Sequence, residues 1–171
     1  LRVHKMTNET VQVAIIMGSD SDLPVVEASF SILDDFGVKY TKNVMSAHRT
    51  PHDVMDLIKK SEENGCKVFI AAAGMAAHLA GAVAAHSTKP VIGIPIESGG
   101  MGGIDSLLST AMMPPGVPVA TVAVGKSGAK NSAILAVQIL ATSDEDLAKK
   151  LVDYKQNMRS EVLEKDKKLN S

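Results

Sequence analysis

The sequence lacks tryptophan, and aromatic residues make up only 3% of the chain. The hydrophobic core therefore has to be built from Val, Ile, Leu, Met and Ala, whose small side chains allow helices and strands to approach one another closely. A chain of 171 residues fits one domain, so we expect a single α/β core rather than two.

Three further absences exclude classes of protein. A formal net charge of -1 offers no basic surface for nucleic acid. No run reaches the roughly 18 apolar residues that a membrane span requires, and the first residues lack the apolar region of a signal peptide. With Cys66 as the only cysteine, an internal disulfide and a multi-cysteine metal site are excluded. We predict a soluble, cytoplasmic protein, and a small anionic ligand remains open.

Apolar runs predict five strands: VQVAIIMG (11–18), VKYTKNVMS (38–46), KVFIAAAG (67–74), PVIGIPI (90–96) and VPVATVAVG (117–125). Four of the runs are almost continuously apolar, which is typical of strands buried on both faces of a parallel sheet. The second run alternates, with Lys39, Thr41 and Lys42 among its residues, and this pattern favours an edge strand.

Helix signals separate these runs. Asp22 is expected to cap a helix that extends to residue 36. Thr50 predicts the next N-cap, with Pro51 at the first helical position and Asp53 where a capping-box acid belongs. Further helices are expected in MAAHLAGAVAAHS (75–87), DSLLSTAMM (105–113) and GAKNSAILAVQILA (128–141).

A last helix is expected to begin with Ser143 as its cap. Its apolar residues are spaced by three and four and form one stripe on a charged surface: Leu147, Leu151, Tyr154, Met158 and Val162. In a five-stranded domain this stripe has little core left to cover, so we expect it to contribute to contacts between subunits. The alternative is that the last helix packs only on its own sheet.

The alternation of strands and helices predicts an α/β fold with helices on both faces of the sheet. We expect a flavodoxin-like three-layer sandwich with a parallel five-stranded sheet of order 2-1-3-4-5 and an extra C-terminal helix. Residues 1–10 are expected to be disordered or a remnant of expression cloning, residues 11–142 to form the α/β catalytic domain, and residues 143–171 to add a helix to that domain.

In such a sheet, ligands bind beyond the carboxyl ends of the strands, where the strand order reverses. The loop GSDSD (18–22) lies there and opens a helix, so its N–H groups and the hydroxyls of Ser19 and Ser21 can bind a phosphate. Asp22 can accept hydrogen bonds from sugar hydroxyls. The simpler alternative is that Ser21 or Asp22 only caps the helix.

Two neighbouring loops, SAHRT (46–50) and AGMAAHLAG (73–81), carry the other reactive side chains. His48 is a candidate acid/base because histidine exchanges protons near neutral pH. Arg49 offers donors for phosphate or carboxylate, unless it forms only a surface ion pair. His78, expected in the first turn of the helix after the third strand, either faces the same crevice or packs among alanines.

Motifs for other chemistry are incomplete. No GxGxxG follows the first strand, and the GKS at 125–127 lacks the first glycine of a P-loop. His48 and His52 are four residues apart, but Thr50 and Pro51 interrupt the helix that would align them on a metal. We therefore expect neither a metal nor a cofactor. The glycine-rich loop 97–103 either closes over the pocket or serves only as a turn.

In order and spacing, a set of motifs between about residues 13 and 141 closely resembles the PurE family of purine biosynthesis: MGSDSD, SAHRTP, AGMAAHLAG, PVIGIPI, DSLLSTAMMPPGVPVATVAVG and AKNSAILAVQIL. The chain looks like the branch of N5-carboxyaminoimidazole ribonucleotide mutases, which are isomerases. The second branch carboxylates aminoimidazole ribonucleotide directly with CO2; it typically has Lys in place of Arg49 and lacks a counterpart of His78. One departure from the family pattern is Ala80, where proline is usual.

The resemblance implies roles for particular residues. His48 would be the general acid/base, and the ribose phosphate would be held by Ser19, Ser21, Asp22, Ser46 and Arg49. The pocket around the substrate's imidazole ring and its migrating carboxyl group would be lined by Ala73, Gly74, His78 and Leu79. The resemblance further implies transient CO2, no metal, ATP or biotin, and a homo-octamer. Two alternatives stay open, namely a direct aminoimidazole ribonucleotide carboxylase and a non-catalytic phosphate- or nucleotide-binding flavodoxin-like module.

Overall fold

The computed structural model describes residues 10–171. Within them, one parallel sheet has the strand order β2-β1-β3-β4-β5. Its strands are β1 (Val13–Met17), β2 (Tyr40–Val44), β3 (Val68–Gly74), β4 (Val91–Ile96) and β5 (Ala120–Thr121). The predicted flavodoxin-like order is confirmed, with β2 at an edge as expected. The predicted vector-derived or disordered segment lies, apart from residue 10, outside the described residues.

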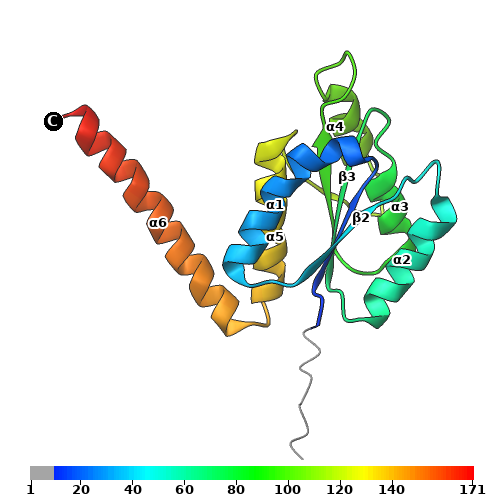
Figure 1. Cartoon of the computed structure of the whole chain (residues 1–171), viewed down its shortest axis with the longest axis horizontal. Helices are drawn as coiled ribbons and strands as arrows, with labels where there is room; N and C mark the ends of the chain where they lie inside the picture. Colours follow the sequence, from blue (N-terminus) through cyan, green and yellow to red (C-terminus); the bar gives the residue numbers. More distant parts are fainter. Residues whose placement is uncertain (1–9) are drawn as a thin grey trace, which may run out of the picture.

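Helices cover both faces of the sheet (Figure 1). One face packs against α1 (Leu23–Phe36) and α5 (Lys126–Ala141), and the other against α2 (Pro51–Glu63) and α3 (Leu79–His86). Every residue of β1 and of β4 is buried. Because both of their faces lie in a core, these strands have almost continuous apolar sequences rather than alternating ones.

The fifth strand is much shorter than the apolar run 117–125 predicts. Only Ala120 and Thr121 pair with β4, opposite Ile92 and Gly93. Pro118, which lacks an N–H donor, limits the ladder at the start of the run. After Thr121 the chain still follows β4, because Val122 N–H donates to the Gly93 carbonyl, but it no longer forms a regular strand.

Asp22 and Thr50 are the N-cap residues of α1 and α2, as predicted, but neither caps its helix through its side chain. Asp22 makes no side-chain capping contact with α1; it belongs to a capping box with Ser19 around the short 3-10 helix η1 (Asp20–Asp22). Pro51 begins α2 as predicted, but Thr50 does not cap it through its side chain. The Thr50 hydroxyl accepts from Ser46 N–H and donates to the Ser46 carbonyl, so no capping box with Asp53 forms.

The last helix, α6 (Glu145–Leu169), begins later than predicted. Asp144, not Ser143, is its cap: the carboxylate accepts from the N–H groups of Asp146 and Leu147. A carboxylate at this position is favoured because it also interacts with the positive end of the helix dipole. From there α6 extends away from the sheet (Figure 1).

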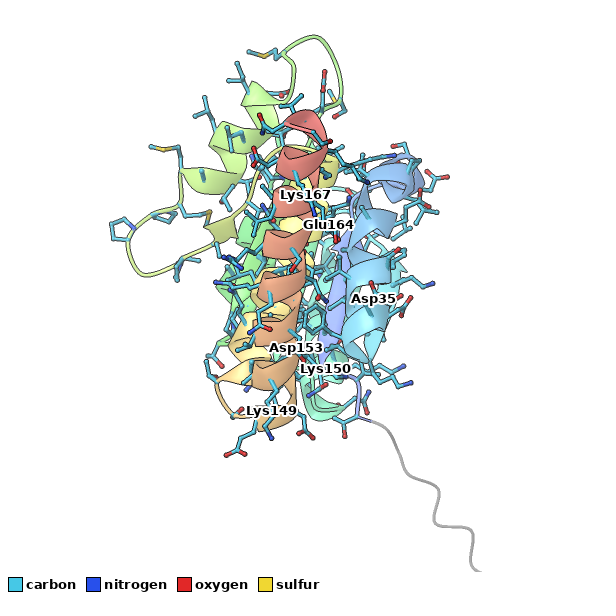
Figure 2. All side chains as sticks on the ribbon, turned by 90° about the vertical axis from the view of Figure 1, so that its left-hand side faces the viewer. Asp35, Lys149, Lys150, Asp153, Glu164 and Lys167 are labelled. Atoms are coloured by element: carbon cyan, nitrogen blue, oxygen red, sulfur yellow. The ribbon has the colours of Figure 1, made fainter. Side chains whose placement is uncertain are left out.

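Only the first part of α6 packs on the domain. Leu147 is buried, whereas Met158 and Val162, later in the same stripe, are 50% and 63% exposed. Lys150 donates to the Phe36 carbonyl at the end of α1 over 2.8 Å. Charged side chains such as Lys149, Lys150, Asp153, Glu164 and Lys167 are distributed along the helix (Figure 2). No helix in residues 10–171 is both long enough and apolar enough to span a membrane.

Candidate active site

All ten residues predicted for the site line one cavity beyond the carboxyl ends of β1, β2 and β3. Its volume is about 510 Å³. The predicted residues around it are Ser19, Ser21, Asp22, Ser46, His48, Arg49, Ala73, Gly74, His78 and Leu79. The reversal of strand order between β1 and β3 leaves this space open, because the loops after these strands turn to helices on opposite faces of the sheet.

The loop after β1 forms a small polar cradle. Ser19 Oγ accepts from Ser21 N–H at 3.3 Å and from Ser21 Oγ at 2.8 Å. The two hydroxyls thus lie side by side at the start of η1, and both line the cavity. A hydroxyl pair next to helical N–H groups is suited to bind a phosphate, as the sequence predicts.

Asp22 lies beneath this cradle and is only 6% exposed. Its Oδ2 accepts from Ser19 N–H at 3.1 Å. Burial raises the pKa of the Asp22 carboxyl above its usual value, and the nearby charge of Asp20 adds to this, while hydrogen bonds from the backbone of Ser19 and Gly18 oppose it. The carboxylate is therefore held in place by the backbone at the wall of the cavity.

Ser46 shapes the turn after β2. Its Oγ accepts from His48 N–H at 3.3 Å and from Arg49 N–H at 3.2 Å, and its carbonyl accepts from Thr50 N–H at 2.9 Å. This hydrogen bonding closes the turn before Pro51 starts α2. Both His48 and Arg49 are thereby presented on the exposed side of the turn, at the cavity.

Arg49 connects the loops of two adjacent strands. Its Nη2 donates to the Gly18 carbonyl at 2.8 Å. A guanidinium has five N–H donors, so one contact with the backbone leaves capacity for an anion. The position next to the Ser19 and Ser21 hydroxyls supports phosphate binding rather than the alternative of a surface ion pair alone.

The two histidines of the cavity contact each other directly. His48 Nε2 lies 2.7 Å from His78 Nδ1, and the rings meet edge to face with their centroids 4.8 Å apart. His78 is not in the first helical turn as predicted; it is the N-cap residue of α3, which begins at Leu79. The reason is the turn before it, in which Met75 has a φ of 56° and His78 N–H donates to the Ala76 carbonyl.

Sequence reasoning missed several residues that line the cavity: Gly18, Ala47, Met75 and Ser98. The most informative is Ser98, in the glycine-rich loop after β4. A Cβ on Gly74 would lie 1.9 Å from Ser98 Oγ, so the absence of a side chain at Gly74 allows Ser98 to approach the cavity. The run of glycines from 99 indicated an unusual loop, but no local signal singled out Ser98.

Size alone does not identify the site. A larger hollow, of about 710 Å³, lies between the edge strand β2 and the end of α2. It is lined by Thr41, Asn43, Lys60 and Glu63 among others, and no histidine or cysteine is among its lining residues. The smaller cavity combines a histidine pair with the paired hydroxyls of Ser19 and Ser21. Nowhere in residues 10–171 are three or more His, Cys, Asp or Glu side chains grouped to hold a metal ion.

Comparison with known proteins decides the family. The model of the family described as AIR carboxylase matches residues 12–161, which is most of the chain. The chain belongs to the AIR carboxylase family. Within this family, a Bacillus subtilis protein named N5-carboxyaminoimidazole ribonucleotide mutase is 50% identical over 157 residues, covering 92% of this chain and 97% of the relative.

Other members of the AIR carboxylase family are similarly close. The Escherichia coli K12 protein of the same name is 46% identical over 157 residues, covering 92% of this chain and 93% of the relative. The crystal structure of Treponema denticola PurE is 30% identical and superposes with a TM-score of 0.84, covering 94% of this chain and 99% of that one. These matches confirm the predicted PurE resemblance and the fold.

Proposed function

We propose that this chain is a mutase of purine biosynthesis, an isomerase that converts N5-carboxyaminoimidazole ribonucleotide to 4-carboxyaminoimidazole ribonucleotide. The supporting observation is that relatives 46% to 50% identical to this chain carry this mutase's name, and that they align over nearly their whole length. The cavity beyond β1, β2 and β3 has residue types suited to this substrate, because hydroxyl and guanidinium donors for a phosphate and small side chains both line it.

In the proposed complex, the substrate phosphate lies against the hydroxyls of Ser19 and Ser21 and the guanidinium of Arg49. Asp22 accepts hydrogen bonds from the ribose hydroxyls, since its carboxylate is fixed at the cavity wall by Ser19 N–H. Ser46 holds the turn that carries His48. The imidazole ring of the substrate lies over the small surface formed by Ala73, Gly74 and Leu79, beside His78.

The proposed reaction moves one carboxyl group from nitrogen to carbon. His48 donates a proton to the exocyclic nitrogen as its bond to the carboxyl carbon breaks and CO2 leaves. The ring carbon C4 then attacks the retained CO2, and His48 accepts the proton that C4 loses. Substrate and product have the same atoms, so the steps balance without an oxidant or a co-reactant. Acid/base catalysis of this kind contributes about 10²–10⁴ in rate.

Two residues favour the mutase over direct carboxylation. The direct carboxylases typically have Lys where this chain has Arg49, and they lack a counterpart of His78. Here both mutase features are present, and the His48 and His78 rings are in contact. A non-catalytic phosphate-binding module would have no use for a histidine pair in the same cavity as the Ser19 and Ser21 hydroxyls.

We also propose a cytoplasmic homo-octamer in which residues 11–142 form the catalytic domain and residues 143–171 contribute subunit contacts. The supporting observation is the stripe on α6. It begins buried at Leu147 and continues to side chains at Met158 and Val162 that are at least half exposed. Apolar side chains repeated along one helix face bury themselves when a partner surface covers them.

One experiment tests the reaction. The purified protein is given N5-carboxyaminoimidazole ribonucleotide at low CO2 and, separately, aminoimidazole ribonucleotide with bicarbonate, and the C4-carboxylated product is followed in each. Rapid product formation from the first substrate supports the mutase. Product from the second mixture alone would assign the direct carboxylase, and absence of product from both would indicate a binding module.

A further inference from the structure

The turn between β3 and α3 holds a backbone conformation that most residues avoid. Met75 is the one non-glycine residue with positive φ in the part of the chain that the structure describes, at 56°. An L-residue in the left-handed region costs on the order of 1–2 kcal/mol. The Met75 side chain is 63% exposed and adds little packing to offset this. Contacts from outside the turn must therefore stabilise it.

Ser109, on α4 (Ile104–Ala111), provides such a contact. Its Oγ accepts from Ala77 N–H at 3.0 Å and lies 3.3 Å from the Met75 carbonyl. It also lies 2.6 Å from the Asp105 carbonyl of its own helix, which is the nearest acceptor for the hydroxyl proton. A single oxygen thus joins α4 to the turn. Because Ala77 is only 2% exposed, its N–H would lose this partner without ready access to water.

The turn carries one half of the histidine pair. Ala77 directly precedes His78, whose Nδ1 lies 2.7 Å from His48 Nε2. A displacement of about 1 Å would break this hydrogen bond, and misplacement on that scale can cost about 100-fold in rate. A shift of Ala77 would therefore move His78 relative to His48 and so change the proposed catalytic geometry.

We propose that Ser109 is a positioning residue, which holds the turn 75–78 so that His78 stays in hydrogen-bond contact with His48. This inference rests on the proposed function for its kinetic consequence, though not for its geometry. Neighbouring hydroxyls of α4 are used differently: Ser106 Oγ donates to the Ile96 carbonyl, and Thr110 Oγ1 donates to the Ser106 carbonyl. Ser109 is thus distinguished by its contact with the turn.

The test compares Ser109→Ala with Ser109→Thr, which keeps a hydroxyl, in steady-state kinetics and crystal structures. Ser132→Ala is the matched control, because Ser132 is a buried helical serine whose Oγ donates to the Ala129 carbonyl at 2.7 Å, away from the cavity. We expect Ser109→Ala to lower kcat by about 10- to 100-fold with little change in KM. Its crystal structure should show the two histidine nitrogens beyond hydrogen-bond distance. Ser109→Thr and Ser132→Ala should retain most of the turnover.

Other outcomes separate the inference from the proposed function. Full turnover in Ser109→Ala, or an unchanged histidine contact in its crystal structure, would overturn the positioning role. If the unsubstituted protein does not act on N5-carboxyaminoimidazole ribonucleotide, the proposed function fails, and the crystal structures still decide whether Ser109 holds the pair. If Ser109→Ala does not fold, Ser109→Cys replaces it. A thiol is a weak hydrogen-bonding group, so it keeps part of the contact with Ala77 N–H. We then expect the distance between His48 Nε2 and His78 Nδ1 to increase, but by less than in Ser109→Ala.

Discussion

His48 Nε2 and His78 Nδ1 lie 2.7 Å apart, although 30 residues separate them in the sequence. At this distance one nitrogen carries a proton and the other accepts it, so the tautomer of one ring is linked to that of the other. The contact therefore couples the position of the ring proton in His48 to that in His78.

Replacement of His48 should separate binding from turnover. The side chain of His48→Asn still forms hydrogen bonds but cannot carry a proton between two atoms of the substrate. We expect kcat to fall by about 10²–10⁴-fold while the affinity for a phosphorylated ligand stays within a few-fold. Steady-state kinetics and calorimetric titration measure the two effects. Replacement of His52, an exposed histidine of α2, serves as the control, and near-normal turnover in His48→Asn would remove the acid/base assignment.

The pKa of Asp22 predicts how stability depends on pH. Because burial raises the folded-state pKa above the usual 3.8, the folded protein binds a proton at this carboxyl at higher pH than the unfolded chain does. The contribution of the Asp22 carboxyl to the free energy of unfolding therefore increases as the pH falls from neutral through the raised pKa. Asp22→Asn keeps an acceptor for Ser19 N–H and removes the titration.

We expect Asp22→Asn to unfold at equal or higher urea concentration than the native sequence at neutral pH, and to lose that advantage towards pH 4. Substrate affinity should fall by roughly 10-fold or more, because a charged acceptor is lost. Urea unfolding of both proteins across this pH range measures the difference, with Asp35→Asn, which removes an exposed carboxyl of α1, as the control. A difference in stability that does not change with pH would contradict the role of burial.

Substitution of Gly74 should disturb the loop after β4. The Cβ of alanine would lie 1.9 Å from Ser98 Oγ, 2.9 Å from Ser98 Cβ and 3.2 Å from the Ile96 carbonyl oxygen. We expect Gly74→Ala to displace Ser98, to raise KM and to lower the unfolding free energy by about 1–3 kcal/mol. Adding Ser98→Gly should restore much of the stability, because the two nearest atoms are then gone.

Gly100→Ala is the matched control for this substitution, since a Cβ there would meet no atom within 4 Å. It should leave both the unfolding free energy and KM close to those of the native sequence. Gly74→Ala with unchanged stability and unchanged KM would show that the loop adapts freely and that Ser98 has no fixed position.

The two halves of the α6 stripe should respond differently to substitution. Leu147→Ala creates a cavity in the core, so we expect a loss of about 2–5 kcal/mol in unfolding free energy. Val162→Asp changes a side chain that is 63% exposed, and it should instead reduce the mass measured by sedimentation. Gln156→Asp, an exposed polar position on the same helix, is the control for added charge. An intact octamer in Val162→Asp would exclude this part of α6 from the subunit contacts.

Much of the fold could be predicted because a strand that is buried on both faces has a continuously apolar sequence. β1, β3 and β4 coincide with continuous apolar runs, and the ends of α1 and α2 lie next to Gly37 and Gly65, both with positive φ. The predictions that failed for the helix caps concern competition between neighbouring polar groups. The Thr50 hydroxyl could cap α2 or close the Ser46 turn, and the sequence contains no signal that decides between them.

The sequence by itself determined which loops carry reactive side chains, since residue type and the position of each loop after a strand are local properties. Only the tertiary structure decided which of these side chains meet. The contact of His48 with His78, the approach of Ser98 to Gly74 and the contact of Ser109 with Ala77 each join segments far apart in the chain. Such contacts depend on the register of parallel strands and the packing of helices, where a shift of one residue changes every neighbour.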